Sequence, residues 1–334
     1  MTPDALPSPV LVTGSSGHLG AALMRRLRAE GVSAVGLDPI PGPTTDVVGS
    51  AADRGLVDEA MSGVQAVLHA GALHKPQVAT HSRRDFVDAN IIGTQNLLEA
   101  GCEAGIDRFV FTSTTSLMID RQLRAGLATD SDQPRRAAAW ITEALAPLKP
   151  RNIYGVSKLA AEHLCRLQHD LLGLPVVILR TSRFFPEEDD RSQHIQQSGP
   201  NTKVNELLFR RVSLEDVVES HLQALRRAPA LGFDTFIISA PSPFQRGDRE
   251  ALLRDAPAVV AGYFPGYRAI YARLGWSMFD RIDRVYVSDR AVGRLGWRPK
   301  MDFAAALAAL EAGVPPTKVV DHDPDFRHAP PSPD

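Results

Sequence analysis

The sequence contains little that would mark a secreted, membrane or nucleic-acid-binding protein. Only two of its 334 residues are cysteines. Cys102 and Cys165 both lie in predicted helices, far apart, so we expect reduced thiols and no disulfide framework. Lysine and arginine (37) nearly balance aspartate and glutamate (39), and no basic block is present that could displace counterions from a nucleic acid. No run approaches the roughly 18 apolar residues of a membrane span.

The first residues also lack the basic start and apolar run of a signal or transit peptide. Together these absences predict a soluble, cytoplasmic protein that binds neither nucleic acid nor a membrane. Residues 1–8 carry prolines, and residues 315–334 are dense in proline, aspartate and histidine. We therefore expect both ends to be flexible tails.

The sequence does contain a regular alternation of short β-rich apolar runs and longer amphipathic segments. This alternation is typical of crossover units that build a parallel sheet. We predict strands at residues 10–12, 34–37, 46–48, 66–69, 108–112, 174–179 and 235–239. Long helices are expected at residues 83–102, 154–172 and 214–225, and a surface loop with a helical piece at residues 120–149.

A glycine-rich turn joins the first predicted strand to the first predicted helix. Gly14, Gly17 and Gly20 follow a G-x-x-G-x-x-G spacing. Without a Cβ the backbone can approach a pyrophosphate, and the helix N-terminus offers N–H groups and the positive end of its dipole. We interpret the turn as a dinucleotide cradle, and a merely tight turn is the alternative. His18 lies inside the turn, where a side chain usually points to solvent, so we give its side chain no role. The cradle includes three further residues by position: Ser16, His18 and Leu19.

An aspartate ends the second predicted strand, roughly 18 residues beyond Gly20. At this place Asp38 can accept hydrogen bonds from both hydroxyls of an adenosine ribose and would repel a 2′-phosphate. No arginine lies beside it or in the glycine turn, so the sequence favours NAD over NADP. The alternative is a solvated turn residue before Pro39.

A tyrosine and a lysine lie four residues apart on a predicted helix. This spacing puts Tyr154 and Lys158 on one face, where an ammonium group can stabilise a phenolate. A tyrosine with a lowered pKa is a usable general acid and base. A run of hydroxyl residues, 113–116, follows the fifth strand at the carboxyl edge of the predicted sheet, where open α/β sheets bind their ligands.

Together these features resemble the extended short-chain dehydrogenase/reductases of the NAD-dependent epimerase/dehydratase family. The motifs that match in family order are the glycine turn, Asp38 and residues 69–72, 90–94, 112–114, 154–158, 179–185, 212–218 and 295–299. The resemblance implies an α/β fold with a Rossmann-type doubly wound parallel sheet and a smaller α/β C-terminal substrate lobe. The NAD-binding domain would cover residues 9–180, with later segments returning to it at about 207–240, and the lobe residues 181–206 and 241–312.

The resemblance also implies roles for single residues. Tyr154 would be the catalytic acid and base, and Lys158 would bind the nicotinamide ribose and lower the tyrosine pKa. Thr114 matches the family's catalytic hydroxyl, with Ser113 as the less favoured candidate. Asn90 would hold its helix and a water near the lysine, or only bond within its helix. The residues implied to line the cofactor channel are Ala70, Gly71, Ala72 and Thr112, of which Gly71 and Ala72 are also explained by close packing alone.

Two departures from the family pattern bear on the reaction and the substrate. Thr115 and Ser116 stand where 4,6-dehydratases have an Asp-Glu pair, so dehydration is disfavoured. The interval between Phe185 and Arg210 is short for an enzyme that clamps a nucleotide, and it contains an acidic segment at residues 186–191. This favours a free sugar, a sugar acid or another polyol-like compound over a nucleotide sugar, which stays open as a substrate.

The sequence therefore predicts an NAD-dependent epimerase or oxidoreductase that acts on a hydroxyl or carbonyl of a sugar-like substrate. The alternatives are a dehydrogenase of a free sugar, sugar acid or other non-nucleotide alcohol and, less favoured, a dinucleotide-sensing regulator. A homodimer through the helices at 83–102 and 154–172 is implied by the resemblance, and no metal is expected. Substrate contacts are proposed by location only, with surface ion pairs as the alternative: His74, Lys75, Thr115, Arg183, Asn205 and Arg211.

Overall fold

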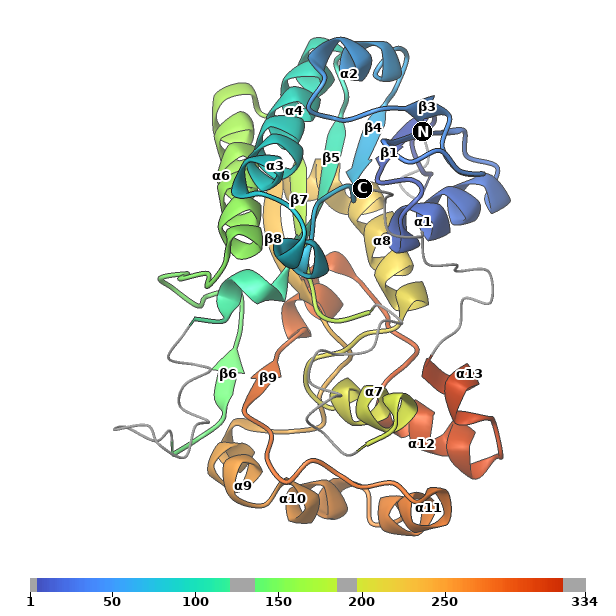
Figure 1. Cartoon of the computed structure of the whole chain (residues 1–334), viewed down its shortest axis with the longest axis vertical. Helices are drawn as coiled ribbons and strands as arrows, with labels where there is room; N and C mark the ends of the chain where they lie inside the picture. Colours follow the sequence, from blue (N-terminus) through green and yellow to red (C-terminus); the bar gives the residue numbers. More distant parts are fainter. Residues whose placement is uncertain (1–4, 121–135, 185–196, 321–334) are drawn as a thin grey trace.

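A seven-stranded parallel sheet forms the centre of the molecule (Figure 1). The computed structural model describes residues 5–120, 136–184 and 197–320. The strands lie in the order β3-β2-β1-β4-β5-β7-β8. Their bounds are β1 Val10–Thr13, β2 Ala34–Asp38, β3 Val47–Val48, β4 Ala66–His69, β5 Arg108–Thr114, β7 Val176–Thr181 and β8 Phe233–Ile238. The chain order reverses between β1 and β4, and the carboxyl ends of such neighbours border a ligand crevice.

Helices cover both faces of the sheet. The buried strands are nearly continuous apolar runs, so each strand presents apolar side chains to both faces. On one face, α1 (His18–Ala29) and α8 (Leu214–Leu231) pack on side chains such as Val10 and Val110. On the other face, α2 (Arg54–Ala60), α4 (Gly93–Glu103) and α6 (Ile153–Leu172) pack on side chains such as Leu11 and Phe111. The predicted doubly wound α/β fold is confirmed.

The long helix predicted at residues 83–102 is interrupted. It consists of α3 (Arg83–Val87), a π-helical turn η2 (Asp88–Ile92) and α4. In such a turn the backbone hydrogen bonds join residues five apart instead of four, and such turns often lie at functional sites. The short 3₁₀ helices are η1 (Lys75–Ala79), η3 (Thr115–Met118) and η4 (Arg246–Asp248), and a second π-helical turn is η5 (Ala291–Leu295).

A second hydrophobic core lies below the sheet in the view of Figure 1. It is built by α7 (Gly199–Leu207), α9 (Arg249–Arg254), α10 (Ala256–Tyr263), α11 (Tyr267–Leu274), α12 (Phe303–Glu311) and α13 (Pro316–Val320). Beside it, β6 (Ala139–Ile141) pairs in parallel with β9 (Arg284–Tyr286). No described helix combines the length and apolar character needed to cross a membrane.

Local predictions differ from the structure at residues 139–141, at residues 316–320 and at Leu6. Residues 139–141, expected in a surface loop, form a strand because they pair with a partner more than a hundred positions later. The acidic segment 186–191 lies outside the described residues. Residues 316–320, expected in a flexible tail, form α13, because the side chain of Val319 is buried in the second core. Leu6, expected in the other tail, packs against the first core.

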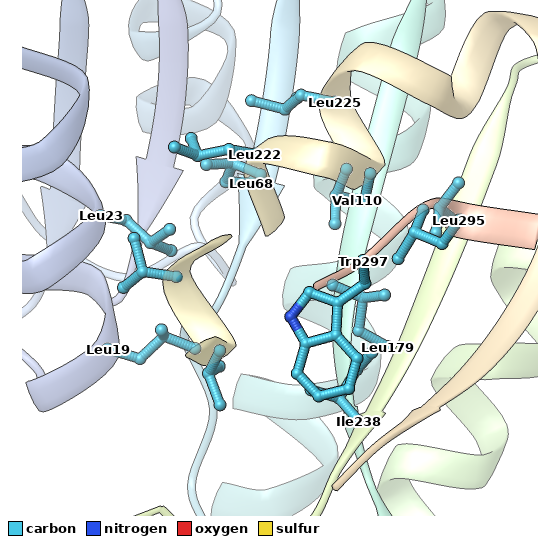
Figure 2. Close-up of a cluster of buried hydrophobic side chains, with 14 of the residues drawn as sticks. Leu19, Leu23, Leu68, Val110, Leu179, Leu222, Leu225, Ile238, Leu295 and Trp297 are labelled. Carbon is cyan, nitrogen blue, oxygen red and sulfur yellow. The ribbon is translucent and has the colours of Figure 1, made fainter. Parts of the chain in front are cut away.

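The first core is completed from the far end of the sequence. Ala291, Leu295 and Trp297 were placed in the substrate lobe, yet they are buried with the sheet and α8. Figure 2 shows the indole of Trp297 beside Leu179 and Ile238. Its Nε1 donates to the carbonyl oxygen of Asp216 at 2.8 Å, and the carboxylate of the same aspartate accepts hydrogen bonds from the N–H groups of residues 300 and 301.

Candidate active site

The glycine turn lies where β1 and β4 end side by side. Gly14 has a φ of 72°, and a Cβ added to it would lie 2.6 Å from the Cα of Gly71 in the loop after β4. A Cβ on Gly20 would collide with the carbonyl oxygen of Gly14. No side chain caps the N-terminus of α1 at Gly17, so its first N–H groups are available to a pyrophosphate. The cradle therefore fits a dinucleotide.

We expect Gly20→Ala to damage this cradle, because the backbone oxygen of Gly14 cannot rotate away from the added methyl group. Overpacking of this kind costs about 1–3 kcal/mol, and a cost of that size in the bound cradle weakens NADH binding about 5–150-fold. Fluorescence titration with NADH measures this. Gly262→Ala is the matched control, because an added Cβ meets nothing within 4 Å there. Equal NADH affinity in both variants would contradict the role given to Gly20.

Asp38 lies beside the turn at the end of β2. Only 6% of its surface is exposed, which excludes the solvated turn residue considered as the alternative. Its carboxylate accepts hydrogen bonds from the N–H groups of Ser16 at 3.1 Å and Ile40 at 2.8 Å. Burial raises the pKa of this carboxyl group, and the two N–H bonds act in the opposite direction. The Ser16 hydroxyl donates to the carbonyl oxygen of Ile40 at 2.6 Å, so the loop after β2 is fastened to the cradle.

The expectation that the His18 side chain points to solvent is wrong. His18 is buried in the first turn of α1, and its ring stacks on Phe184 after β7, with ring centroids 6.4 Å apart. Leu19 is buried in the first core. The two side chains anchor the helix in the protein interior. The predicted role in binding the cofactor therefore falls to their backbone N–H groups and not to their side chains.

Tyr154 and Thr114 meet at the carboxyl edge of the sheet. Tyr154 lies in the first turn of α6, and its hydroxyl is hydrogen-bonded to Thr114 at the end of β5. Burial raises the pKa of Tyr154 to about 12, and the bond to Thr114 offsets only part of this increase. The tyrosine is therefore neutral at pH 7.

Lys158 follows Tyr154 by one helical turn and is only 2% exposed. Its ammonium group lies 3.9 Å from the ring centroid of Phe111. Burial lowers the pKa of Lys158 to about 7, although Cys165 and Glu162 act to raise it. Burial is the dominant influence on the pKa of Tyr154, and the same burial leaves about half of the Lys158 side chains neutral at pH 7. The lowering of the tyrosine pKa by the lysine stays a prediction.

Ser113 is turned away from the tyrosine. Its hydroxyl donates to Glu162 Oε1 at 2.6 Å. The same carboxylate holds Arg180 by two bonds, of 2.9 and 2.6 Å. Glu162 was not predicted from the sequence, although it continues the spacing of four residues that joins Tyr154 and Lys158. These contacts favour Thr114 over Ser113 as the hydroxyl at the site.

Two further hydroxyl groups of the predicted site are used inside the protein. The Thr112 hydroxyl lies 2.8 Å from His221 Nε2 on α8, and burial lowers the pKa of this histidine to about 4. The Thr115 hydroxyl donates to the carbonyl oxygen of Thr181 at 3.3 Å. Neither contact supports the predicted role in binding cofactor or substrate.

Asn90 connects the interrupted helix to both sides of the site. Its amide group exchanges two hydrogen bonds with the backbone of Leu73, at 2.8 and 2.9 Å. Its Nδ2 also donates to the hydroxyl of Ser157 at 2.9 Å. Asn90 thus fastens the loop that carries the partly exposed Ala70, Gly71 and Ala72 to α6, and it does more than bond within its own helix.

The proposed substrate residues fall into two groups. His74 and Lys75 are partly exposed at the start of η1, just after β4. Asn205 is fully buried, where it accepts from the Tyr271 hydroxyl at 2.6 Å and donates to the carbonyl oxygen of Ser277 at 2.9 Å. Asn205, the first member of the second group, thus bonds to residues of the second core. The sequence did not show these partners.

Arg183 and Arg211 both approach Glu206, a carboxylate with no exposed surface. Their Nε atoms lie 3.5 and 2.9 Å from Glu206 Oε2, and Arg210 Nη2 lies 2.7 Å from Oε1. Burial alone would raise the pKa of Glu206, but the three guanidinium groups lower it to about 2. Arg183 is the most exposed of the three arginines, with 33% of its side chain accessible.

Within the described part of the chain, no group of three His, Cys, Asp or Glu side chains could hold a metal ion.

A family model for the NAD-dependent epimerase/dehydratase family matches residues 10–226, which include the cradle, Asp38, Thr114 and the Tyr154 helix. The chain belongs to this family. The resemblance read from the sequence motifs is thereby confirmed, and the predicted cofactor agrees with the dependence on NAD for which the family is named.

Curated relatives perform different reactions on sugar compounds. The chain is 30% identical over 203 residues to the NAD-dependent glucose-6-phosphate dehydrogenase of Haloferax volcanii, covering 56% of this chain and 74% of the relative. It is 32% identical over 192 residues to the UDP-glucose 4-epimerase of Azospirillum brasilense, covering 54% and 50%. Identity to the dTDP-glucose 4,6-dehydratase of Streptomyces antibioticus is 25%, over 90% of both chains.

Solved structures agree with the fold along nearly the whole chain. A short-chain dehydrogenase/reductase superfamily protein from Agrobacterium tumefaciens, crystallised with bound NAD, has a TM-score of 0.62 and 27% identity, covering 91% of this chain and 95% of its own. The UDP-N-acetylglucosamine 4-epimerase of Bacillus cereus, at 22% identity, has a TM-score of 0.61 and shows the shared fold.

Proposed function

We propose that this enzyme uses NAD to oxidise a secondary hydroxyl group of a sugar-type substrate and, in an epimerase cycle, to reduce it again. The observation that carries this proposal is the hydrogen bond between Tyr154 and Thr114, at the same sheet edge as a glycine cradle that has no room for a Cβ at Gly14 or Gly20. Gly14, Gly17 and the first turn of α1 would hold the pyrophosphate, and Asp38 the adenosine ribose.

NAD supplies the acceptor for a hydride from the alcohol carbon. The chain's own residues handle the proton. Thr114 orients the substrate oxygen, and Tyr154 exchanges a proton with it. Because the pKa of Lys158 is about 7, its amine can take up the proton as Tyr154 ionises. The neutral tyrosine is ready to donate in the reductive direction.

The proposed proton path predicts a pH dependence. With Lys158 at a pKa of about 7, its neutral form increases as the pH rises, and we expect the rate of oxidation to rise through about pH 7. The guanidinium group in Lys158→Arg stays charged, so this variant is expected to lose that rise. A kcat/KM profile from pH 5 to 9 measures it. A flat wild-type profile in that range would refute the path through Lys158.

A dehydrogenase of a non-nucleotide substrate is the second candidate. It is supported because Asn205 and Arg211, both predicted as substrate contacts, bond within the protein. Dehydration finds no support next to Thr114, where the following threonine is bonded to the backbone.

Incubation with NAD⁺ and a panel of free, phosphorylated, acidic and nucleotide-linked sugars tests these proposals. Accumulation of NADH supports a dehydrogenase, and isomer conversion without net NADH supports an epimerase. A protein that binds NADH and converts no member of the panel in either assay would favour the dinucleotide-sensing regulator. The cytoplasmic location stays a prediction.

We further propose a homodimer through α6. Val156, Leu167 and Leu171 lie on one face of this helix with 47–68% of their surface exposed. Leu167→Glu is expected to shift the protein to a monomer in light scattering, because a carboxylate would be buried in the interface. Val48→Glu, at an equally exposed valine on β3, is the control. A dimer that survives Leu167→Glu would exclude this face.

A further inference from the structure

A chain of buried hydrogen bonds runs from the dinucleotide cradle toward the catalytic helix, and His69 at the end of β4 lies at its centre. The N–H of Gly71 donates to the hydroxyl of Thr13 at 3.1 Å. That hydroxyl lies 2.6 Å from His69 Nδ1, and Nε2 of the same ring lies 2.9 Å from the hydroxyl of Thr94. The three side chains are at most 2% exposed. β4 lies between β1 and β5 in the sheet (Figure 1), so His69 ends a central strand.

The direction of every bond in this chain can be assigned. Thr94 donates its hydroxyl proton to the carbonyl oxygen of Asn90 at 2.7 Å, so it must accept from His69 Nε2. The Nδ1 atom is then an acceptor, and Thr13 donates to it. Burial, with a smaller contribution from the charge of Lys158, holds the pKa of His69 well below its ordinary value. A neutral ring is the form that this assignment requires.

The chain continues through the π-helical turn to the tyrosine. Asn90, within that turn, donates to Ser157 Oγ at 2.9 Å, and Ser157 donates to the backbone carbonyl oxygen of Tyr154 at 3.0 Å. Both side chains are at most 1% exposed. Removal of one hydroxyl would leave buried polar groups on both sides without a partner, which is costly. The chain therefore has one favourable arrangement.

We propose that His69 is a positioning residue that couples the dinucleotide cradle to the first turn of α6, where Tyr154 lies. The inference rests on the proposed function and extends it: the ring touches neither substrate nor cofactor. It sets the separation between the loop after β4, which carries Gly71, and the helix that carries the acid and base. Binding at the cradle then stabilises the catalytic turn before any substrate enters.

The test uses ADP, which carries the adenosine and diphosphate and no nicotinamide, so that it occupies the cradle without reaching Tyr154. We expect saturating ADP to slow amide hydrogen exchange in the peptide covering residues 150–160 of the wild type about threefold or more. Thr94→Val breaks the chain at His69 and is expected to bind ADP and lose this slowing. Thr94→Ser keeps the hydroxyl and is expected to retain it.

Ser220→Ala is the matched control, because it removes a buried hydroxyl whose contacts, with Val217 O and His221 Nδ1, both lie within α8. If Thr94→Val does not fold, Thr13→Val breaks the same chain from the β1 side. Two results would overturn the coupling. In the first, saturating ADP leaves amide hydrogen exchange at residues 150–160 of the wild type unchanged. In the second, ADP slows this exchange equally in the wild type and in Thr94→Val. Failure of the wild type to bind either ADP or NADH instead overturns the proposed function, and the inference with it.

Discussion

Tyr154→Phe is expected to lower turnover about 10²–10⁴-fold, the contribution typical of a positioned acid and base. The substitution removes only the hydroxyl that is bonded to Thr114 and leaves the ring, so the fold and the cradle are expected to survive. The kcat at saturating NAD⁺ measures the loss, and fluorescence titration with NADH shows that the cofactor still binds. Turnover equal to that of the wild type would remove Tyr154 from the mechanism.

The surrounding residues supply the controls for this result. Tyr263→Phe removes a tyrosine hydroxyl that bonds Asp248 on the surface and is expected to leave kcat unchanged. Thr114→Val is expected to reduce kcat more than Ser113→Ala, because the Ser113 hydroxyl is bonded to Glu162. The reverse order would assign the catalytic hydroxyl to Ser113.

Glu206→Gln is expected to lower the free energy of unfolding by about 3–5 kcal/mol, the cost of removing one partner from a buried ion pair. The substitution keeps the shape of the side chain but leaves buried guanidinium groups without the carboxylate on which they converge. Urea denaturation measures the effect. Glu219→Gln is the control, because its ion pairs with Arg26 and Arg226 are partly exposed and such pairs contribute about 0–1 kcal/mol.

The same carboxylate predicts how stability depends on pH. The pKa of Glu206 is lowered from 4.5 to about 2 in the folded protein, so the unfolded chain binds its proton first. Its contribution is complete above about pH 4.5 and is lost as the pH falls through 2. The stability difference between wild type and Glu206→Gln should therefore narrow between pH 6 and pH 3. A constant difference would mean that the carboxylate keeps an ordinary pKa in the folded state.

Local patterns predicted the sheet well, because each strand is a short apolar run. They also predicted the glycine turn, because its conformation depends on the glycines within it. Contacts distant in sequence were not predictable. The strand at residues 139–141 is defined only by its partner at residues 284–286. The choice between Ser113 and Thr114 depends on Glu162 and Tyr154, which lie on a helix some 40 residues later.

Charged and amide side chains were the hardest to assign. Arg211 and Asn205 have the chemistry of ligand-binding groups, and nothing in the sequence shows that Glu206 and Tyr271 engage them. His69 gave the opposite problem. In the sequence it is only the first residue of the matching motif at 69–72, and nothing there shows that its ring bridges the hydroxyl groups of Thr13 and Thr94.

The position of Trp297 also determines when this protein can finish folding during its synthesis. The last of the seven strands ends at Ile238, well before residue 297 along the chain, yet the first core lacks its indole until that residue is made. A nascent chain that ends near residue 240 has a gap beside Leu179 and Ile238, and the carbonyl oxygen of Asp216 has no indole donor. Domains made early usually fold early. Here the first core is complete only once residue 297 has been made, and a division of the chain near residue 240 would separate the sheet from part of its own core.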